Sequence, residues 1–238
     1  MKTEKTRVLD NLTIFLALLV SLSGLVNGQD ITVTPLNFPP RQWGLVNGPN
    51  MFFSPLNATY GIGTFSFSAS NSLSAANQPW HAFDSNPTSS WTSPALYNAN
   101  GLPTCYNGTT SMTVGGVAYK GDWLQIRAPS AIRLTSFAMS LPAFASSRAP
   151  TDFMLVGSND TITWEAVLSL TSATETRQVL INNYALDYNI TTSKSYTTYR
   201  LLITCAKKGT GNSVNVIDLT FTGYEGASIR LSPGSNLS

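Results

Sequence analysis

The sequence predicts an all-β protein built as a sandwich or barrel, and two observations carry this prediction. From Tyr60 onward, short β-type segments alternate with turn residues, and beyond residue 28 no stretch keeps a 3.6-residue apolar period. Seven or eight short strands at this spacing are typical of antiparallel sandwiches. The expected strands are Thr64–Ser70, Trp123–Arg127, Ile132–Met139, Phe153–Val156, Trp164–Leu168, Tyr199–Thr204 and Val216–Thr222.

Alternation within these segments supports the prediction. In Val216–Thr222, one face carries Ile217, Leu219 and Phe221 and the other carries polar side chains, as expected for a half-buried strand. Between the strands, residues 93–121 are rich in Gly, Asn and Thr and are predicted to form one long loop that contains Cys105. A loop of this length in a compact domain is usually functional or anchored.

The composition excludes several function classes. The 238 residues carry 14 Lys+Arg against 12 Asp+Glu, and only 11% of the chain is charged. There are 28 Ser, 28 Thr and 19 Asn, so uncharged hydrogen-bonding groups supply much of the polar surface. A near-neutral chain lacks the clustered cations that nucleic acid requires. One His and two distant Cys cannot build a Cys/His zinc site, and 42% hydrophobic residues indicate an ordered chain.

The N-terminus has the pattern of an export signal. Three cations precede an uncharged apolar run, Leu12–Val26, that is shorter than the ~20 residues of a bilayer span. Residues 1–28 are therefore predicted to be a signal peptide, with an uncleaved anchor as the alternative. Residues 29–58 contain five prolines and are predicted to be an N-terminal arm. Residues 59–226 form the predicted β-domain, and residues 227–238 a C-terminal tail.

An exported chain permits two covalent modifications. Cys105 and Cys205 are expected to pair in an oxidising compartment, the alternative being two unpaired thiols. Asn-x-Ser/Thr triplets for N-glycosylation occur beyond the signal, although such triplets also arise by chance in a chain of this composition. They begin at Asn57, Asn107, Asn159, Asn189 and Asn236.

Five motifs in order resemble the discoidin domains, also called coagulation-factor C-type domains. The first is Ala82-Phe83-Asp84-Ser85-Asn86-Pro87-Thr88-Ser89-Ser90-Trp91, and the second is Trp123-Leu124-Gln125-Ile126. The third combines Ala149–Phe153 with Val156-Gly157-Ser158-Asn159-Asp160 and Trp164. The fourth is Tyr199-Arg200-Leu201 and the fifth is Ile217–Gly223. The resemblance covers about residues 60–226.

This resemblance implies a galactose-binding-like jelly-roll sandwich with a binding end formed by loops. Members of the family are usually non-catalytic adhesion or recognition modules. This sequence departs from the family pattern at Ser85, where Gly is usual, and at Asp218, where Glu is usual. Its loop between Trp91 and Trp123 is long, and its cysteines are not the pair near the domain ends seen in many animal members.

The resemblance also implies a structural Ca²⁺ beside the first motif. The oxygens would come from Asp84, Asn86, Ser89 and Asp218, which are the hard donors that calcium prefers. The alternative is that Asp84 and Asn86 only make Asx turns, which their side chains favour.

Other side chains are candidates for ligand contact. His81 has no nucleophile motif to serve, so it is expected to be a packed, hydrogen-bonded His, or else a contact to a sugar hydroxyl. Trp80, Trp91, Trp123 and Trp164 are expected chiefly in the core. Candidates for sugar stacking are Tyr97, Tyr106 and Phe144, and candidate loop cations are Arg148, Lys207 and Lys208, each of which is alternatively a solvated loop charge.

The sequence therefore predicts a secreted or surface-displayed, non-catalytic module that recognises carbohydrate, with a glycan or glycoprotein surface as its partner. The alternative is a structural protein of a coat, wall or virion surface that packs against coat or matrix proteins. Nucleic acid is not an expected partner, and a membrane is expected only through an uncleaved signal segment. A hydrolase is disfavoured because Glu165, Glu175 and Glu225 show no spacing typical of a glycosidase pair.

Overall fold

The computed structural model describes residues 35–39, 57–60, 63–97, 104–141, 148–171, 185–207 and 212–225. In these ranges every paired strand is antiparallel, and the one helical element is a 3-10 turn, η1 (Pro79–Ala82). The predicted all-β fold class is confirmed. None of the described helical structure has the length and apolarity to cross a bilayer. The predicted signal segment, the C-terminal tail, Phe144, Glu175, Lys208 and Asn236 lie outside the described residues.

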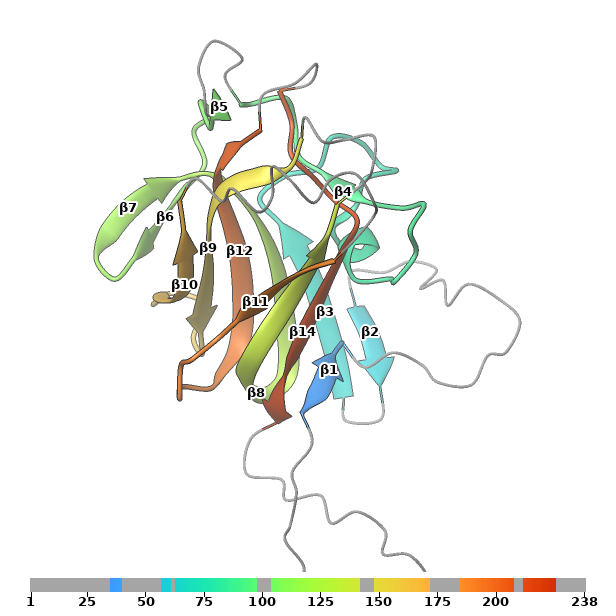
Figure 1. Cartoon of the computed structure of the whole chain (residues 1–238), viewed down its shortest axis with the longest axis vertical. Helices are drawn as coiled ribbons and strands as arrows, with labels where there is room; N and C mark the ends of the chain where they lie inside the picture. Colours follow the sequence, from blue (N-terminus) through green and yellow to red (C-terminus); the bar gives the residue numbers. More distant parts are fainter. Residues whose placement is uncertain are drawn as a thin grey trace, which may run out of the picture. The chain divides into compact units, whose positions relative to one another are not determined.

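One long strand organises the fold. β8 (Asp122–Ser140) joins the segments Trp123–Arg127 and Ile132–Met139, which the sequence predicted as two strands. Its first half pairs with β12 (Tyr196–Ala206) and β3 (Gly63–Ala69). Its second half pairs with β14 (Asp218–Glu225) and β11 (Ala185–Asn189). Because β8 belongs to both layers, the two sheets form one continuous, folded sandwich (Figure 1).

The remaining strands extend the two layers. In the first layer, β12 pairs with β9 (Pro150–Ser158), which pairs with β10 (Glu165–Leu170), and β2 (Asn57–Tyr60) extends β3. In the second layer, β1 (Leu36–Phe38) pairs with β14. These three residues fall in the segment predicted to be an arm, yet Phe38 is only 1% exposed. A single apolar side chain in the core is enough to fix part of the proline-rich segment as an edge strand.

The core lies between the layers. Phe137 of β8 packs edge-on against Phe153 of β9, with ring centroids 6.3 Å apart, and Tyr199 of β12 stacks on Phe221 of β14 at 6.0 Å. These are contacts from one layer to the other, and each fully buried side chain of this size contributes about 1.5–3 kcal/mol. Trp91 and Trp164 are buried as predicted, while Trp80 and Trp123 are half-buried at the edge of the core.

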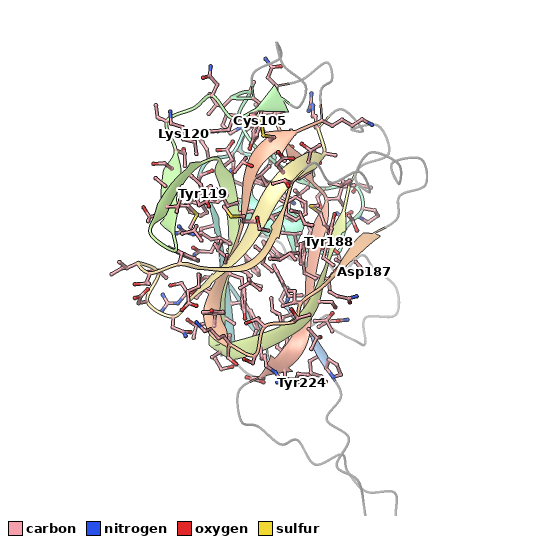
Figure 2. The ribbon with its side chains drawn as sticks, turned by 60° about the vertical axis from the view of Figure 1, so that its left-hand side comes forward. Cys105, Tyr119, Lys120, Asp187, Tyr188 and Tyr224 are labelled. Carbon is pink, nitrogen blue, oxygen red and sulfur yellow. A yellow bond between two sulfur atoms is a disulfide. The ribbon has the colours of Figure 1, made fainter. Side chains whose placement is uncertain are left out.

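The predicted long loop contains a hairpin, so that prediction is wrong over residues 111–120. β6 (Ser111–Val114) and β7 (Val117–Lys120) are joined by Gly115 and Gly116, both with positive φ. A two-residue turn with two positive φ values is the turn that matches strand twist, and only glycine adopts it without strain. Figure 2 shows Tyr119 and Lys120 on this hairpin, whose inner residues pack on β9 and β12 as a second apolar cluster made of Met112, Val114, Met154, Val156, Trp164 and Leu202.

Three of the recognised motifs meet beside that cluster. The Arg200 guanidinium lies between two indole rings, 3.9 Å from the centroid of Trp123 and 4.2 Å from that of Trp164. Its Nε also donates to Oε1 of Gln125 at 2.6 Å. Burial lowers the pKa of Arg200 to about 10, and the ring faces supply part of the stabilisation that water would otherwise give. The motifs around Trp123 and Arg200 are therefore structural.

Candidate functional site

Three distant parts of the chain meet at one end of the sandwich, near β4 (Trp91–Thr92) and β13 (Asn215–Val216) (Figure 1). The Tyr97 N–H donates to the Asn212 carbonyl at 2.8 Å, and the Asn107 N–H donates to the Leu96 carbonyl at 2.8 Å. Backbone hydrogen bonds therefore hold residues 96–97 between the segments that contain Asn107 and Asn212.

The predicted disulfide closes this end. Cys105 and Cys205 are bonded and their Cα atoms lie 3.9 Å apart, because the two residues face each other across β5 (Thr104–Cys105) and β12. Figure 2 shows Cys105 at this end of the molecule. The bond anchors a segment that has only two residues of strand pairing, and it places Asn107 a fixed distance from the end of β12.

A small cavity opens between the joined segments. Its volume is about 210 Å³ and its lining residues are Ala95, Leu96, Tyr97, Asn107 and Asn212. Asn107 is exposed and Asn212 is half-buried, and among the described residues no hydrogen bond holds either side-chain amide. The described lining residues carry no charge. The cavity therefore presents two open amides above a small apolar floor.

Tyr97 and Tyr106 are not exposed stacking residues, so that prediction is wrong. Tyr97 is 1% exposed and its hydroxyl donates to the Ile203 carbonyl at 3.1 Å. Tyr106 is 8% exposed and meets the Tyr97 ring edge-on at 5.4 Å. Burying the large apolar surface of both rings stabilises the core, so these rings pack inside the end of the sandwich and do not face solvent.

The two described loop cations lie close together at the same end. The Arg148 carbonyl accepts from the Asn215 N–H at 3.0 Å, and the Lys207 N–H donates to the Ala149 carbonyl at 2.8 Å. Both side chains are half-buried, and neither lines the cavity. A contact of either cation with a ligand stays a prediction.

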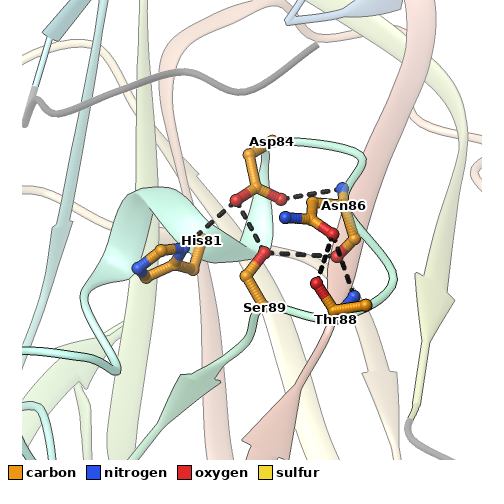
Figure 3. A network of polar contacts seen from close by, with 5 residues as sticks. All are labelled: His81, Asp84, Asn86, Thr88 and Ser89. Carbon is orange, nitrogen blue, oxygen red and sulfur yellow. Dashed lines mark hydrogen bonds and ion pairs between the residues drawn. The ribbon is translucent and has the colours of Figure 1, made fainter. Parts of the chain in front are cut away.

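The first recognised motif forms a closed hydrogen-bonded loop (Figure 3). One carboxylate oxygen of Asp84 accepts from the Asn86 N–H at 2.9 Å, and the other accepts from the Ser89 hydroxyl at 2.7 Å. Oδ1 of Asn86 accepts from both the N–H and the hydroxyl of Thr88, at 3.0 and 2.8 Å. These are Asx turns, the alternative that the sequence left open. Asp84 itself is 2% exposed.

His81 completes this loop. Its Nδ1 lies 3.1 Å from Oδ2 of Asp84, and its ring centroid is 3.7 Å from that of Trp80. Because a carboxylate only accepts, the Nδ1 must carry the hydrogen. Asp84 thus stands between Ser89 and His81, so the imidazole makes no contact that would activate the serine hydroxyl. His81 is 16% exposed and is packed and hydrogen-bonded, as the sequence favoured.

The predicted Ca²⁺ would have to compete with this hydrogen-bonded loop. Both oxygens of Asp84 already accept from donors of its own loop, which a cation would have to displace. Calcium takes six to eight oxygens, and a site usually includes several carboxylates. Among the described residues, no group of three or more His, Cys, Asp and Glu side chains could hold a metal ion. Calcium binding by Asp84, Asn86, Ser89 and Asp218 stays a prediction.

A second buried carboxyl lies beneath the disulfide-closed end. Asp122, at the start of β8, is fully buried, and its Oδ1 accepts from the Ser70 hydroxyl at 2.9 Å. Burial raises the pKa of Asp122, because the low-dielectric interior disfavours the ionised form. The charge of Asp122 also contributes to raising the pKa of Tyr97, although burial of the phenol is the larger cause.

Sequence reasoning missed Asn212 as a lining residue and treated Asn107 only as a glycosylation triplet. The sequence of residues 208–212 is typical of a turn. Nothing in the local pattern connects these residues with residues 96–107. The connection is made by the backbone bonds from Tyr97 and Asn107, which depend on the folded positions of β5, β12 and β13. A covarying pair would have been the only sequence signal for such a contact.

The chain was compared with protein families, curated proteins and solved structures. No protein family matches the chain, and no curated protein matches its sequence. Among solved structures it is similar to a third family 32 carbohydrate-binding module from a family 31 glycoside hydrolase of Clostridium perfringens, at 15% identity and a TM-score of 0.49, over 66% of this chain and 88% of that one.

Two further solved structures have comparable similarity. The family 32 carbohydrate-binding module of Clostridium perfringens NanJ, solved in complex with galactose, has 14% identity and a TM-score of 0.44 over 66% of this chain and 93% of that one. The F5/8 type C domain of a Bacteroides fragilis protein has 13% identity and a TM-score of 0.45 over 68% of this chain and 92% of that one. The described part of this chain is an antiparallel two-layer β-sandwich, and its ordered motifs resemble those of discoidin domains.

Proposed function

We propose that this protein is a non-catalytic carbohydrate-binding module, secreted or displayed on a surface, that holds a sugar in the cavity between Leu96, Asn107 and Asn212. The observation that carries the proposal is the pair of open amides over an uncharged, rigidly held floor. The backbone bonds from Tyr97 and Asn107 and the nearby disulfide hold the lining in place before a ligand arrives. Such preorganisation lowers the ordering cost of binding.

The chemistry of the lining suits a neutral glycan. Each asparagine amide offers two N–H donors and one carbonyl acceptor, which is the combination that neighbouring sugar hydroxyls require. No charged side chain is among the lining residues. A cavity of about 210 Å³ is smaller than the roughly 300–1,000 Å³ typical of drug-sized ligands, so it suits one sugar residue or the end of a chain.

The carboxylates of the described residues support a binding role without hydrolysis. Glu165 pairs with Lys194 and accepts from the Tyr196 hydroxyl at 3.2 Å. Glu225 accepts from the Ser130 hydroxyl at 2.6 Å. Neither lines the cavity, whereas glycoside hydrolysis generally requires a carboxylate pair about 5–10 Å apart across the scissile bond.

A glycan array and calorimetry test this proposal. Unglycosylated protein with its disulfide intact is screened on the array, with galactose among the probes, and the best ligand is then titrated. We expect Asn212→Ala to weaken binding about tenfold, which is the loss of one hydrogen bond of about 1.4 kcal/mol. The control is Asn189→Ala, at an exposed asparagine that lies on β11 and does not line the cavity.

The contrary outcome is equally clear. Failure on every glycan, together with oligomers on size-exclusion chromatography, would refute the carbohydrate-binding proposal and favour a structural coat, wall or virion-surface protein. Turnover of a glycan that is lost on changing Glu165 or Glu225 would refute the absence of catalysis.

A further inference from the structure

One lining residue of the cavity also begins a glycosylation triplet, Asn107-Gly108-Thr109. We propose that Asn107 carries an N-linked glycan in the exported protein and that this glycan closes the cavity, so that occupancy of Asn107 turns ligand binding off. The first half of this proposal stands on the geometry of the triplet. The second half rests on the proposed function of the cavity.

The structure leaves the acceptor groups of this triplet open. The side chains of Asn107 and Thr109 are exposed, and among the described residues no hydrogen bond holds the Asn107 amide or the Thr109 hydroxyl. The Asn107 backbone N–H is fixed by its bond to the Leu96 carbonyl. The amide nitrogen is therefore accessible, while the backbone that carries it is held at the cavity.

Gly108 allows the triplet to lie close to the core. A Cβ atom at this position would lie 2.3 Å from the Tyr106 hydroxyl oxygen and 2.4 Å from the ring carbon that carries it. Any larger residue would push the segment off the buried Tyr106 ring. The glycine thus keeps Asn107 at the rim of the cavity with its side chain toward solvent.

The triplet at Asn159 differs in the same structure. The Asn159 amide nitrogen donates to the Ser195 carbonyl at 3.2 Å, and its Oδ1 accepts from the Thr197 N–H at 2.8 Å. The Thr161 hydroxyl donates to the Asp160 carbonyl at 2.6 Å. A sugar on Asn159 would replace one N–H of a nitrogen that already donates to Ser195, in a side chain held on both of its polar atoms. We therefore expect a glycan at Asn107 and not at Asn159.

The covalent step is a glycosyl transfer with a lipid-pyrophosphate-linked oligosaccharide as co-reactant. The Asn107 amide nitrogen forms a bond to C1 of the first N-acetylglucosamine and loses one proton. The bond between C1 and the pyrophosphate oxygen breaks, and the lipid pyrophosphate leaves with that electron pair. The product is a bulky, surface-bound chain that begins at the cavity rim.

Occlusion follows from where the chain is attached. A glycan tethered at the rim has a local concentration at the cavity mouth in the millimolar range that is typical of short flexible links. The tethered glycan occupies space at the cavity mouth, and its hydroxyl groups can bind the same amides as the ligand. It therefore competes with free ligand. It also removes one of the two N–H donors of the Asn107 amide.

The test uses the full chain secreted from a eukaryotic host. Occupancy is mapped by mass spectrometry after peptide N-glycosidase treatment in heavy-oxygen water, which marks each released site as an Asp that carries the heavy oxygen. We expect Asn107 to be marked and Asn159 to be unmarked. Thr109→Ala removes the triplet but keeps the Asn107 amide, and Thr191→Ala is the matched control because it removes the triplet of Asn189, which does not line the cavity.

Ligand binding is then measured for the same secreted proteins. We expect Thr109→Ala to bind the array-selected glycan at least tenfold more tightly than glycosylated wild type, while Thr191→Ala behaves as wild type. An unmarked Asn107 would overturn the modification, and equal affinities of Thr109→Ala and fully occupied wild type would overturn the occlusion. If unglycosylated protein binds no glycan, the proposed function fails, but the mass-spectrometric result still decides whether Asn107 is an acceptor.

Discussion

Two polar regions at the same end of the sandwich have opposite hydrogen-bonding states. In the Asp84 loop, the carboxylate, both Asx turns and the imidazole satisfy one another, and Asp84 is 2% exposed. At the cavity, the amides of Asn107 and Asn212 have no partner among the described residues. The loop that the family motif marks most strongly is internally hydrogen-bonded, and the unengaged amides lie in a region that the family motifs do not include.

The two buried carboxyls differ in a similar way. Asp84 accepts from a backbone N–H, a hydroxyl and an imidazole, so its charge is well solvated by the fold. For Asp122, the Ser70 hydroxyl donates to one oxygen while burial raises the pKa of the group. The raised pKa of Asp122 makes its contribution to stability depend on pH.

The largest expected effect comes from removing the disulfide, which lies beside the cavity. Changing both Cys105 and Cys205 to Ser removes a link between residues 100 apart, which costs up to about 4.7 kcal/mol in the chain-entropy account. Because the bond lies next to Asn107, we expect glycan affinity to fall as well. Urea unfolding and calorimetry measure the two effects. Unchanged affinity in the folded double variant would show that the disulfide does not shape the cavity.

The next effect is confined to the Asp84 loop. Asp84→Ala leaves the Asn86 N–H, the Ser89 hydroxyl and the His81 Nδ1 hydrogen without their acceptor, and we expect a loss of about 2–4 kcal/mol. Glycan affinity of the folded fraction should not change. Thr88→Val, at an exposed position of the same loop, is the control and should cost less. A loss of glycan affinity in Asp84→Ala would show that the Asp84 loop and the cavity belong to one site.

A smaller effect distinguishes the two carboxyls. Since burial raises the folded-state pKa of Asp122 above its unfolded value of about 3.9, its contribution to stability is full below that value and is lost as pH rises through the folded-state pKa. Asp122→Asn should flatten the pH dependence of unfolding in this window, as measured by thermal denaturation at closely spaced pH values. The exposed Asp187→Asn is the control, and an identical slope in wild type and Asp122→Asn would contradict this account.

The smallest expected effect concerns calcium. Because the oxygens of Asp84 are already engaged, adding Ca²⁺ or a chelator should leave the melting temperature unchanged within about 1 °C, well below the shift that binding far above Kd would give. Differential scanning fluorimetry measures this directly. A rise of several degrees with calcium would show that the loop rearranges to bind the ion and would restore the calcium prediction for Asp84, Asn86, Ser89 and Asp218.

The sequence predicted the strands because their signal is local. Alternation marks β3 and β14 within a few residues, as the pleat requires. Short apolar runs bounded by turn residues mark β9 and β12. The predictions failed where a distant contact decides the structure. Phe38 is drawn into the core from a proline-rich segment, and the aromatic rings of Tyr97 and Tyr106 are buried against each other instead of facing solvent.

What the sequence by itself determined was the class of the protein: a neutral, hydroxyl-rich all-β chain with ordered motifs. Only the tertiary structure decided that the cysteines pair and where the proposed binding cavity lies. The cavity needs Leu96, Asn107 and Asn212 side by side, and these residues meet only because backbone hydrogen bonds and one disulfide join segments that are remote in sequence. Local patterns encode which face of a strand is buried, but they carry no information on which open polar groups the fold will leave facing one another.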